Sequence, residues 1–264
     1  MTPLRGLFLF MQSLLTSNDC NDTLREGDAV LLKVSGNELE GKGFNELLRY
    51  ISCLQRKRLK TVLVYGGGMQ IDRAYYNLHK SERQRMQSKA SVDEAVRKAY
   101  FKIRRHLNDW IPAIQFADSF GIQVYEDEID VSDASLREEF DSITAFGFIG
   151  TDGETNYNLN ADSVACALIQ QFQSIRRAIF CTDVGCIYGK DKKRIPVIHS
   201  HHIQDDGSHT FIETSAGIRP KLLACKKSGL SEVLITSATK LRENMDVREM
   251  HRESGTIVRN TQGQ

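Results

Sequence analysis

The sequence predicts an α/β protein with a mostly parallel sheet that helices cover on both faces. Short apolar runs predict buried strands, and longer segments with apolar residues at helical spacing lie between them. Two of these runs, Ala29–Val34 and Thr61–Tyr65, lead into glycine-containing turns. Buried strands that alternate with helices favour parallel pairing, because each helix carries the chain back to the start of the next strand.

The individual elements follow from the same patterns. Buried strands are expected at Ala29–Val34, Thr61–Tyr65, Ser142–Ile149, Arg177–Cys181, Glu232–Ile235 and Gly255–Arg259, with short strand candidates at Pro112–Phe116 and Gly121–Tyr125. Helices are expected at Phe44–Gln55, from Met69 to Leu78, at Ser91–Trp110, directly after Asp162, and from about Ile218 to Lys227.

Residues 1–27 stand apart from this series. Their apolar residues share one helical face, which predicts an amphipathic helix that docks on the body or on another subunit: Leu4, Leu7, Phe8, Met11 and Leu15. A signal peptide is the less favoured alternative, because Gln12 interrupts the apolar run and no cleavage site of small residues follows.

Composition excludes several classes of function. The chain has 264 residues, with 35 Lys and Arg against 34 Asp and Glu, so its formal charge of +1 gives no sign of a general nucleic-acid or membrane-surface binder. No apolar run is long enough to span a bilayer. The six cysteines form no C-x-x-C pair and are expected to be buried, reduced thiols of a cytoplasmic protein.

A polar segment, Asn156–Asp162, stands directly before an apolar run with helical spacing. Asn and Asp are favoured at helix starts, and the N-terminus of a helix attracts anionic ligands. A buried Asp162 would need cations, and Lys33 and Lys221 stand in apolar or helix-start settings. Lys33 could instead be a strand-edge lysine that reaches solvent. The predicted chemistry is phosphoryl transfer by these three charged residues.

The two glycine turns and Asp183 are weaker signals. Glycine at the carboxyl end of a strand lets backbone amides approach a phosphate closely, but Gly66–Gly68 lacks the Gly-Lys-Ser/Thr ending of a P-loop and could be a simple tight turn. Asp183 is either a turn aspartate or a nucleotide contact. His199, His201 and His202 stand in a polar stretch that is expected to be a loop, and no metal site is predicted there.

In their order, these motifs resemble the amino acid kinase family, and within it the acetylglutamate kinases. The resemblance covers residues from about 28 to the C-terminus and rests on Lys33-Val-Ser-Gly36, Tyr65-Gly-Gly-Gly-Met-Gln-Ile-Asp72, Tyr157-Asn-Leu-Asn-Ala-Asp162, Thr182-Asp-Val-Gly185, Gly217-Ile-Arg-Pro-Lys221 and Gly255-Thr256. It implies a three-layer αβα sandwich. The lobe at about 28–155 would bind an acyl amino acid, and the lobe at about 156–264 would bind ATP.

The resemblance also implies roles for individual residues. Lys33 and Lys221 would flank the transferring phosphoryl group, and Asp162 would hold both lysines. The remaining binding residues would be Gly67, Gly68 and Asn158 for the acceptor, and Gly36, Thr182, Asp183 and Gly217 for ATP with Mg²⁺. The implied reaction is phosphorylation of the side-chain carboxylate of N-acetyl-L-glutamate. The implied assembly is a homodimer, or a larger ring built through the N-terminal helix.

The acceptor half departs from the family pattern. Ser35 replaces the first glycine of the first turn, and Met69 replaces a proline after the triple glycine. The Gly-Leu-Arg-Val-Thr segment, whose arginine binds a substrate carboxylate in the family, is missing, and Arg83 or Arg85 would have to substitute. Two alternatives therefore stay open: a kinase of another N-acylated acidic amino acid, and a sensor of amino acids that has the kinase fold without turnover.

Overall fold

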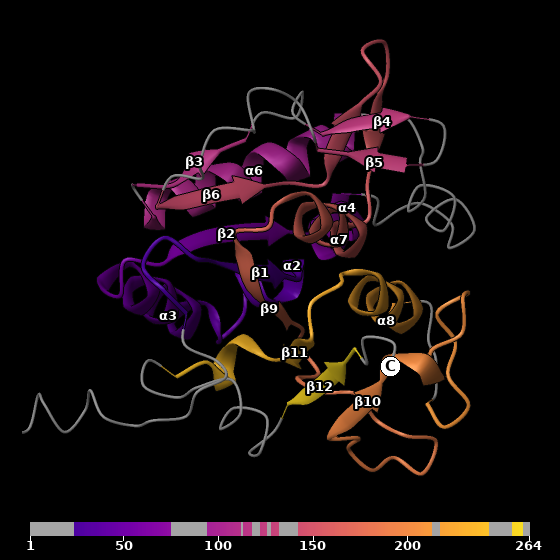
Figure 1. The fold of residues 1–264 in the computed structure, drawn as a ribbon. Helices are drawn as coiled ribbons and strands as arrows, with labels where there is room; N and C mark the ends of the chain where they lie inside the picture. Colours follow the sequence, from indigo (N-terminus) through magenta and orange to yellow (C-terminus); the bar gives the residue numbers. More distant parts are fainter. Residues whose placement is uncertain are drawn as a thin grey trace, which may run out of the picture.

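The computed structural model describes residues 24–74, 94–111, 113–117, 122–125, 128–131, 142–212, 217–242 and 255–260. Its centre is an eight-stranded sheet in the order β10-β12-β11-β9-β1-β2-β6-β3 (Figure 1). All neighbouring pairs in this sheet are parallel except β11 and β12. The predicted mostly parallel sheet is therefore confirmed. Its strands are β1 (Ala29–Val34), β2 (Lys60–Tyr65), β3 (Gln115–Phe116), β6 (Ile143–Phe146), β9 (Ile175–Cys181), β10 (Val197–His199), β11 (Glu232–Thr236) and β12 (Thr256–Arg259).

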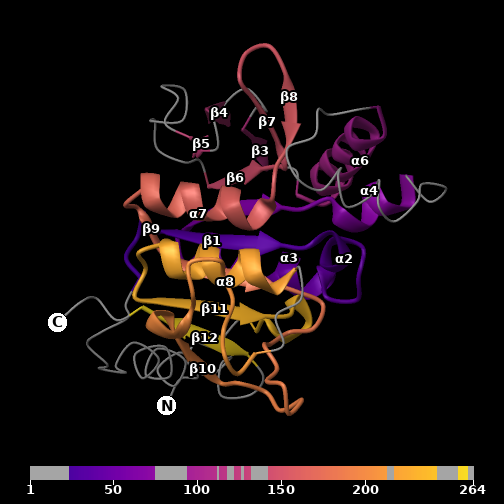
Figure 2. The same ribbon diagram turned by 90° about the vertical axis from the view of Figure 1, so that its right-hand side faces the viewer.

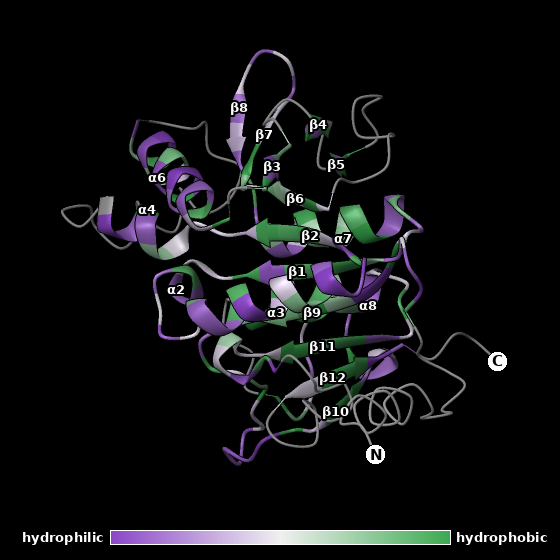
Figure 3. Ribbon diagram, turned by 90° about the vertical axis from the view of Figure 1, so that its left-hand side faces the viewer, coloured by the Kyte–Doolittle hydropathy of each residue, from purple (hydrophilic) through white to green (hydrophobic). Residues whose placement is uncertain are grey.

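Helices cover both faces of this sheet and complete the three layers. Helices α3 (Phe44–Arg56) and α6 (Glu94–Trp110) lie on one side, and α7 (Ala161–Gln171) and α8 (Ile218–Lys227) on the other (Figures 1 and 2). The buried apolar residues form one cluster under each helical layer. The core therefore lies on both faces of the sheet, and strands such as β2 and β11 are hydrophobic along most of their length (Figure 3).

The shorter helices lie close to the ends of strands. Helix α2 (Gly36–Leu39) follows β1, α4 (Gly68–Ala74) follows β2, and the 3-10 helix η4 (Ala238–Lys240) follows β11. Helix α4 begins where a helix was predicted, and the rest of the prediction to Leu78 lies outside the described residues. The loop predicted around the histidines is wrong, because β10 ends at His199 and a second 3-10 helix, η3 (Ser200–His202), follows.

The sequence predicted no second sheet, although its strand candidate Gly121–Tyr125 contains β4 (Gln123–Tyr125) of that sheet. The second sheet contains β4, β5 (Glu128–Asp130), β7 (Ile149–Thr151) and β8 (Asn156–Asn158), in the order β5-β4-β7-β8 (Figure 2). The single strand predicted at Ser142–Ile149 is wrong, because the chain leaves the main sheet after Phe146 and enters the second sheet at Ile149. Between them, a Cβ atom on Gly147 would lie 2.3 Å from Cε2 of Tyr100. Only glycine fits at this crossing between the two sheets.

Two expectations from composition can be compared with the described residues. The five cysteines that the structure describes are buried and free, as predicted: Cys53, Cys166, Cys181, Cys186 and Cys225. Within the described ranges, no helix combines the length and the apolar character needed to cross a bilayer. The N-terminal helix predicted within residues 1–27 lies outside the described part, apart from residues 24–27.

Candidate active site

Lys33 is buried at the carboxyl end of a central strand. Leu31, two residues earlier in β1, belongs to the apolar cluster beneath α7 and α8, whereas Leu32 belongs to the opposite cluster. Side chains two residues apart in a strand point to the same face, so Lys33 points toward α7 and α8. Its side chain is only 8% exposed, which excludes the alternative of a lysine that reaches solvent. A buried ammonium group requires an anionic partner.

Asp162 is that partner, and the start of α7 holds it in place. Asn160 is the N-cap residue, with extended backbone angles, and its Oδ1 accepts a hydrogen bond of 2.8 Å from the backbone N–H of Asp162. The carboxylate therefore lies in the first turn of α7, where the helix dipole favours negative charge. It is 5% exposed, and its Oδ1 lies 2.7 Å from Nζ of Lys33.

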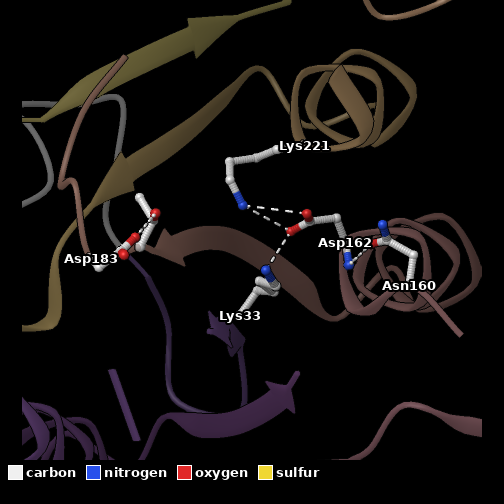
Figure 4. Close-up of polar contacts among 6 residues, drawn as sticks. Lys33, Asn160, Asp162, Asp183 and Lys221 are labelled. Atoms are coloured by element: carbon white, nitrogen blue, oxygen red, sulfur yellow. Dashed lines mark hydrogen bonds and ion pairs between the residues drawn. The ribbon is translucent and has the colours of Figure 1, made fainter. Parts of the chain in front are cut away.

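Lys221 approaches the same carboxylate from α8. Its Nζ lies 3.1 Å from Oδ1 and 3.3 Å from Oδ2 of Asp162, and its side chain is 9% exposed. Figure 4 shows the two ammonium groups converging on Asp162, from β1 and from α8. One carboxylate thus neutralises only half of the positive charge, and the trio of Lys33, Asp162 and Lys221 carries a net charge of +1.

Burial and mutual attraction set opposite directions for the three pKa values. Burial lowers the pKa of Lys33 to about 8; Asp162 opposes this shift and Lys221 adds to it. For Lys221, burial also acts to lower the pKa, but the carboxylate outweighs it and the pKa is raised. Burial would raise the pKa of Asp162, yet the two lysines lower it. Asp162 is therefore ionised at neutral pH, and Lys33 is the group closest to losing its charge.

The two predicted glycine turns lie side by side at the carboxyl ends of β1 and β2, which are neighbours in the sheet. A Cβ atom on Gly36 would lie 2.3 Å from Oε1 of Gln70 and 3.1 Å from the carbonyl oxygen of Gly66. A Cβ atom on Gly67 would lie 2.3 Å from the ring of Phe148, whereas Gly68 has open space around it. A Cβ atom at Gly67 would thus collide with an aromatic ring, whereas one at Gly36 would displace the Gln70 amide.

These turns present backbone donors of the kind that bind phosphate oxygens. In the part of the chain that the structure describes, the backbone N–H groups of Gly36, Gly67 and Gly68 donate no hydrogen bond to another backbone group. Free amides beside a buried, net positive trio are the donors that bind phosphate oxygens in proteins. Mg²⁺ is commonly held by phosphate oxygens and water with one or two carboxylates, so it needs no cage of protein ligands.

Thr182 and Asp183 follow β9, next to the first glycine turn. The Thr182 hydroxyl and the Val184 amide each donate a hydrogen bond of 3.1 Å to Oδ1 of Asp183. Asn37 Nδ2 donates a hydrogen bond of 2.9 Å to Oδ2 of Asp183. Asp183 therefore stabilises its own turn, as one alternative predicted, and also contacts the residue after Gly36. In Figure 4, Asp183 and Asp162 lie on opposite sides of the two lysine side chains.

The other predicted binding residues are less closely connected to the trio. Asn158 is buried at the end of β8, two residues before the N-cap of α7. Gly217 is the residue before α8, and no atom lies within 4 Å of a Cβ added there. Arg83 and Arg85 lie outside the described residues. The substrate contacts predicted for all of these positions stay predictions.

The structure adds residues that sequence reasoning missed. Gln70, Asn37 and Phe148 each contact a glycine turn or its neighbour, but only Gln70 had a usable signal, because it follows the triple glycine within the first turn of α4. Across the ranges that the structure describes, no group of three or more His, Cys, Asp or Glu side chains is placed to hold a metal ion. The histidines at 199, 201 and 202 are described by the structure and do not form such a group.

Known proteins share both the sequence pattern and the fold. Residues 28–237 match the Amino acid kinase family. The acetylglutamate kinase of Methylobacterium nodulans is 28% identical, with 75% of this chain and 76% of that protein covered.

Solved structures show the same fold at low identity. The N-acetylglutamate synthase of Neisseria gonorrhoeae, complexed with coenzyme A and L-arginine, matches 98% of this chain with a TM-score of 0.66 and 16% identity. This chain spans only 66% of that synthase chain. The match to the carbamate kinase of Giardia has a TM-score of 0.57 and 13% identity, and it covers 89% of this chain and 99% of that chain. The match to the isopentenyl phosphate kinase of T. acidophilum has a TM-score of 0.55 and 15% identity, and it covers 88% of this chain and 100% of that chain. The family match spans most of the sequence and includes Lys33, Asp162 and Lys221, so the chain belongs to the amino acid kinase family.

Proposed function

We propose that this protein is an ATP-dependent kinase that phosphorylates the side-chain carboxylate of N-acetyl-L-glutamate. The observation that carries the proposal is the buried trio, in which two lysines converge on Asp162 beside the free amides of two glycine turns. The similarity to an acetylglutamate kinase supports this acceptor over the phosphate and carbamate acceptors named for other proteins of the fold.

In the proposed reaction, an oxygen of the acceptor carboxylate attacks the γ-phosphorus of ATP. A new P–O bond forms, the bond from the γ-phosphorus to the bridging oxygen of ADP breaks, and the products are an acyl phosphate and ADP. The attacking carboxylate is already ionised at neutral pH, so no general base is required. Bound Mg²⁺ would neutralise charge on the phosphate oxygens.

Each part of the site supplies one contribution. Lys33 and Lys221 stabilise the negative charge on the phosphoryl oxygens as the group moves between the two oxygens. Asp162 orients both ammonium groups and keeps them charged. The amides of Gly36, Gly67 and Gly68 align the phosphoryl group and the attacking carboxylate.

The proposal extends to the organisation of the chain. Residues at about 28–155, with Arg85 among them, would bind the acceptor, and Asn158 would join them from just beyond that boundary. Residues at about 156–264 would bind ATP with Thr182, Asp183 and Gly217. The protein would act in the cytoplasm as a homodimer. Light scattering tests the assembly, and a monomer at micromolar concentration would contradict it.

An acyl-phosphate trap tests the activity. ADP release is measured with ATP, Mg²⁺ and hydroxylamine for N-acetylglutamate, N-succinylglutamate, glutamate, N-acetylaspartate and UMP. We expect a hydroxamate with N-acetylglutamate and little turnover with UMP. A hydroxamate with a different N-acyl acid would replace the substrate but keep the reaction. A protein that binds ATP and turns over none of the acids would contradict the proposal and favour the sensor.

A further inference from the structure

Gln70 connects the two glycine turns. It is the third residue of α4, two residues after Gly68, and is only 4% exposed. Its Nε2 donates a hydrogen bond of 3.0 Å to the carbonyl oxygen of Gly36, which lies 34 residues earlier in the chain. A single side chain thus links the start of α4, after β2, to the turn after β1.

The orientation of the Gln70 amide is fixed by its surroundings. The Gly36 carbonyl can only accept, so the nitrogen of the amide must face it. Burial would raise the pKa of Glu40, but hydrogen bonds from Gln70 and Arg73 lower it. Glu40 also pairs with Arg73 of α4 and lies 3.7 Å from Nζ of Lys102 in α6. Gln70 therefore belongs to a network that anchors the first glycine turn to two helices.

A side chain at Gly36 would displace the Gln70 amide. The space that a Cβ atom would occupy is 2.3 Å from Oε1 of Gln70, an oxygen that is itself buried with no hydrogen-bond partner. The hydrogen bond that Nε2 donates to Gly36 is the contact through which Gln70 acts on the site.

We propose that Gln70 is a positioning residue that sets the spacing between the Gly36 amide and the amides of Gly67 and Gly68. This inference rests on the proposed phosphoryl transfer, in which these amides bind the terminal phosphoryl group. Without the hydrogen bond to Gly36, the turns keep the backbone bond from Gly66 N–H to the carbonyl oxygen of Val34, but the Gly36 amide is no longer held at its distance from Gly67 and Gly68, and contacts to the γ-phosphoryl group are weakened. Contacts to the α- and β-phosphates, the ribose and the base are unchanged.

Nucleotide binding tests the proposal without any acceptor. Calorimetry with Mg²⁺ compares ADP with the non-hydrolysable ATP analogue AMPPNP for the full chain and for Gln70→Met, which keeps length and volume but removes the donor. We expect Gln70→Met to bind AMPPNP about tenfold more weakly, the loss of roughly one hydrogen bond, and ADP within about twofold of the natural chain. Equal changes for both nucleotides, or no change, would overturn the proposal.

Asn260 provides a matched control. Its Nδ2 donates to the carbonyl oxygens of Cys225 and Leu230, and its Oδ1 is buried with no partner, yet it lies at the end of β12. Asn260→Leu removes a partly buried amide that also donates to backbone carbonyls, and it should leave the preference for AMPPNP over ADP unchanged. If Asn260→Leu shifted this preference as much as Gln70→Met, a general loss of stability would explain both, and the positioning role would be rejected.

A second variant supplies a readout that a merely structural role would not move. In Gln70→Glu the ionised carboxylate cannot donate to Gly36, but its protonated form can. AMPPNP affinity relative to the natural chain should therefore rise as the pH falls from about 7.5 to about 5.5, and Gln70→Met should show no such rise. The same pH response in both variants would contradict the proposal.

The outcomes separate the two proposals. If the natural chain binds AMPPNP but phosphorylates no acid, the proposed acceptor fails and the Gln70 comparison still stands. If an acid is phosphorylated while Gln70→Met keeps both affinities, only the positioning role fails. If the natural chain binds no AMPPNP, both fail.

Discussion

Replacing Asp162 with asparagine removes the negative charge of the trio while nearly keeping its shape. The ammonium groups of Lys33 and Lys221 lie 2.7 and 3.1 Å from Oδ1, and all three side chains are more than nine-tenths buried. Removing one partner of a buried ion pair costs about 3–5 kcal/mol. Because the pKa of Lys33 is already lowered to about 8, this lysine can lose its proton cheaply, and we expect a cost near the lower limit.

A cost of about 3 kcal/mol corresponds to a fall in Tm of about 6–12 °C for a chain of this size. Loss of oriented charge at a phosphoryl group should lower kcat by at least about 100-fold. Thermal unfolding and the hydroxamate assay measure the two effects. AMPPNP should raise the Tm of the variant more than that of the natural chain, because its phosphates replace the missing anion.

Asp205→Asn is the control for this experiment. Its ion pair with Lys226, at 2.9 Å, is as short as those of Asp162, but Asp205 is fully exposed, and such surface pairs contribute little to stability. The control should lose little stability and no activity. Asp162→Asn with the turnover of the natural chain would refute the catalytic role of Asp162, and an unchanged Tm would refute the buried ion trio.

Three further predictions concern Lys33, Gly67 and Glu38, a buried residue of α2. The pKa of Lys33 is lowered to about 8, so AMPPNP affinity should fall as the pH rises through about 8. The Lys33→Arg variant should not show this fall, because arginine stays charged. An AMPPNP affinity of the natural chain that stays constant to about pH 9.5 would contradict this prediction. Gly67→Ala should lower the free energy of unfolding by about 1–3 kcal/mol, because the added Cβ atom would meet Phe148. Gly68→Ala is the control, because the space there is open, and it should lower this free energy by less than about 1 kcal/mol. Equal losses for the two variants in chemical denaturation would contradict the packing argument. Burial raises the pKa of Glu38, so the ionisation of this side chain destabilises the folded state at a pH above its unfolded pKa. The Glu38→Gln variant should therefore have a higher Tm than the natural chain at about pH 8 but not at about pH 4. A lower Tm of the variant at about pH 8 would contradict this prediction.

Local patterns predicted the parts of the fold that depend on one segment at a time. The apolar run of β1 and the helical spacing of the apolar residues in α3 predict which side chains are buried, and the structure confirms both predictions. The polar segment before Asp162 predicted a helix start, and the Asn160 cap shows why the helix begins there. Lysine in an apolar strand was informative because a buried charge needs a partner.

Contacts between distant segments could not be predicted in this way. The run at Ser142–Ile149 appears continuous in sequence, and only the packing of Gly147 against Tyr100 shows that it crosses between two sheets. The Gln70 bond to Gly36 and the Asn37 bond to Asp183 join residues 34 and 146 positions apart. Neither leaves a periodic pattern, because each depends on tertiary structure rather than on local propensity.

The charge of the trio explains why the glycine turns must contribute to the proposed function. Lys33, Asp162 and Lys221 together carry +1, whereas the terminal phosphates of ATP carry several negative charges. The trio alone would leave most of that charge uncompensated in a buried setting, where unpaired charge is costly. Backbone amides and Mg²⁺ must supply the remainder, and amides act only when their positions are fixed. The close packing of Gly36 against Gln70 and of Gly67 against Phe148 therefore fixes the amides on which the proposed reaction depends.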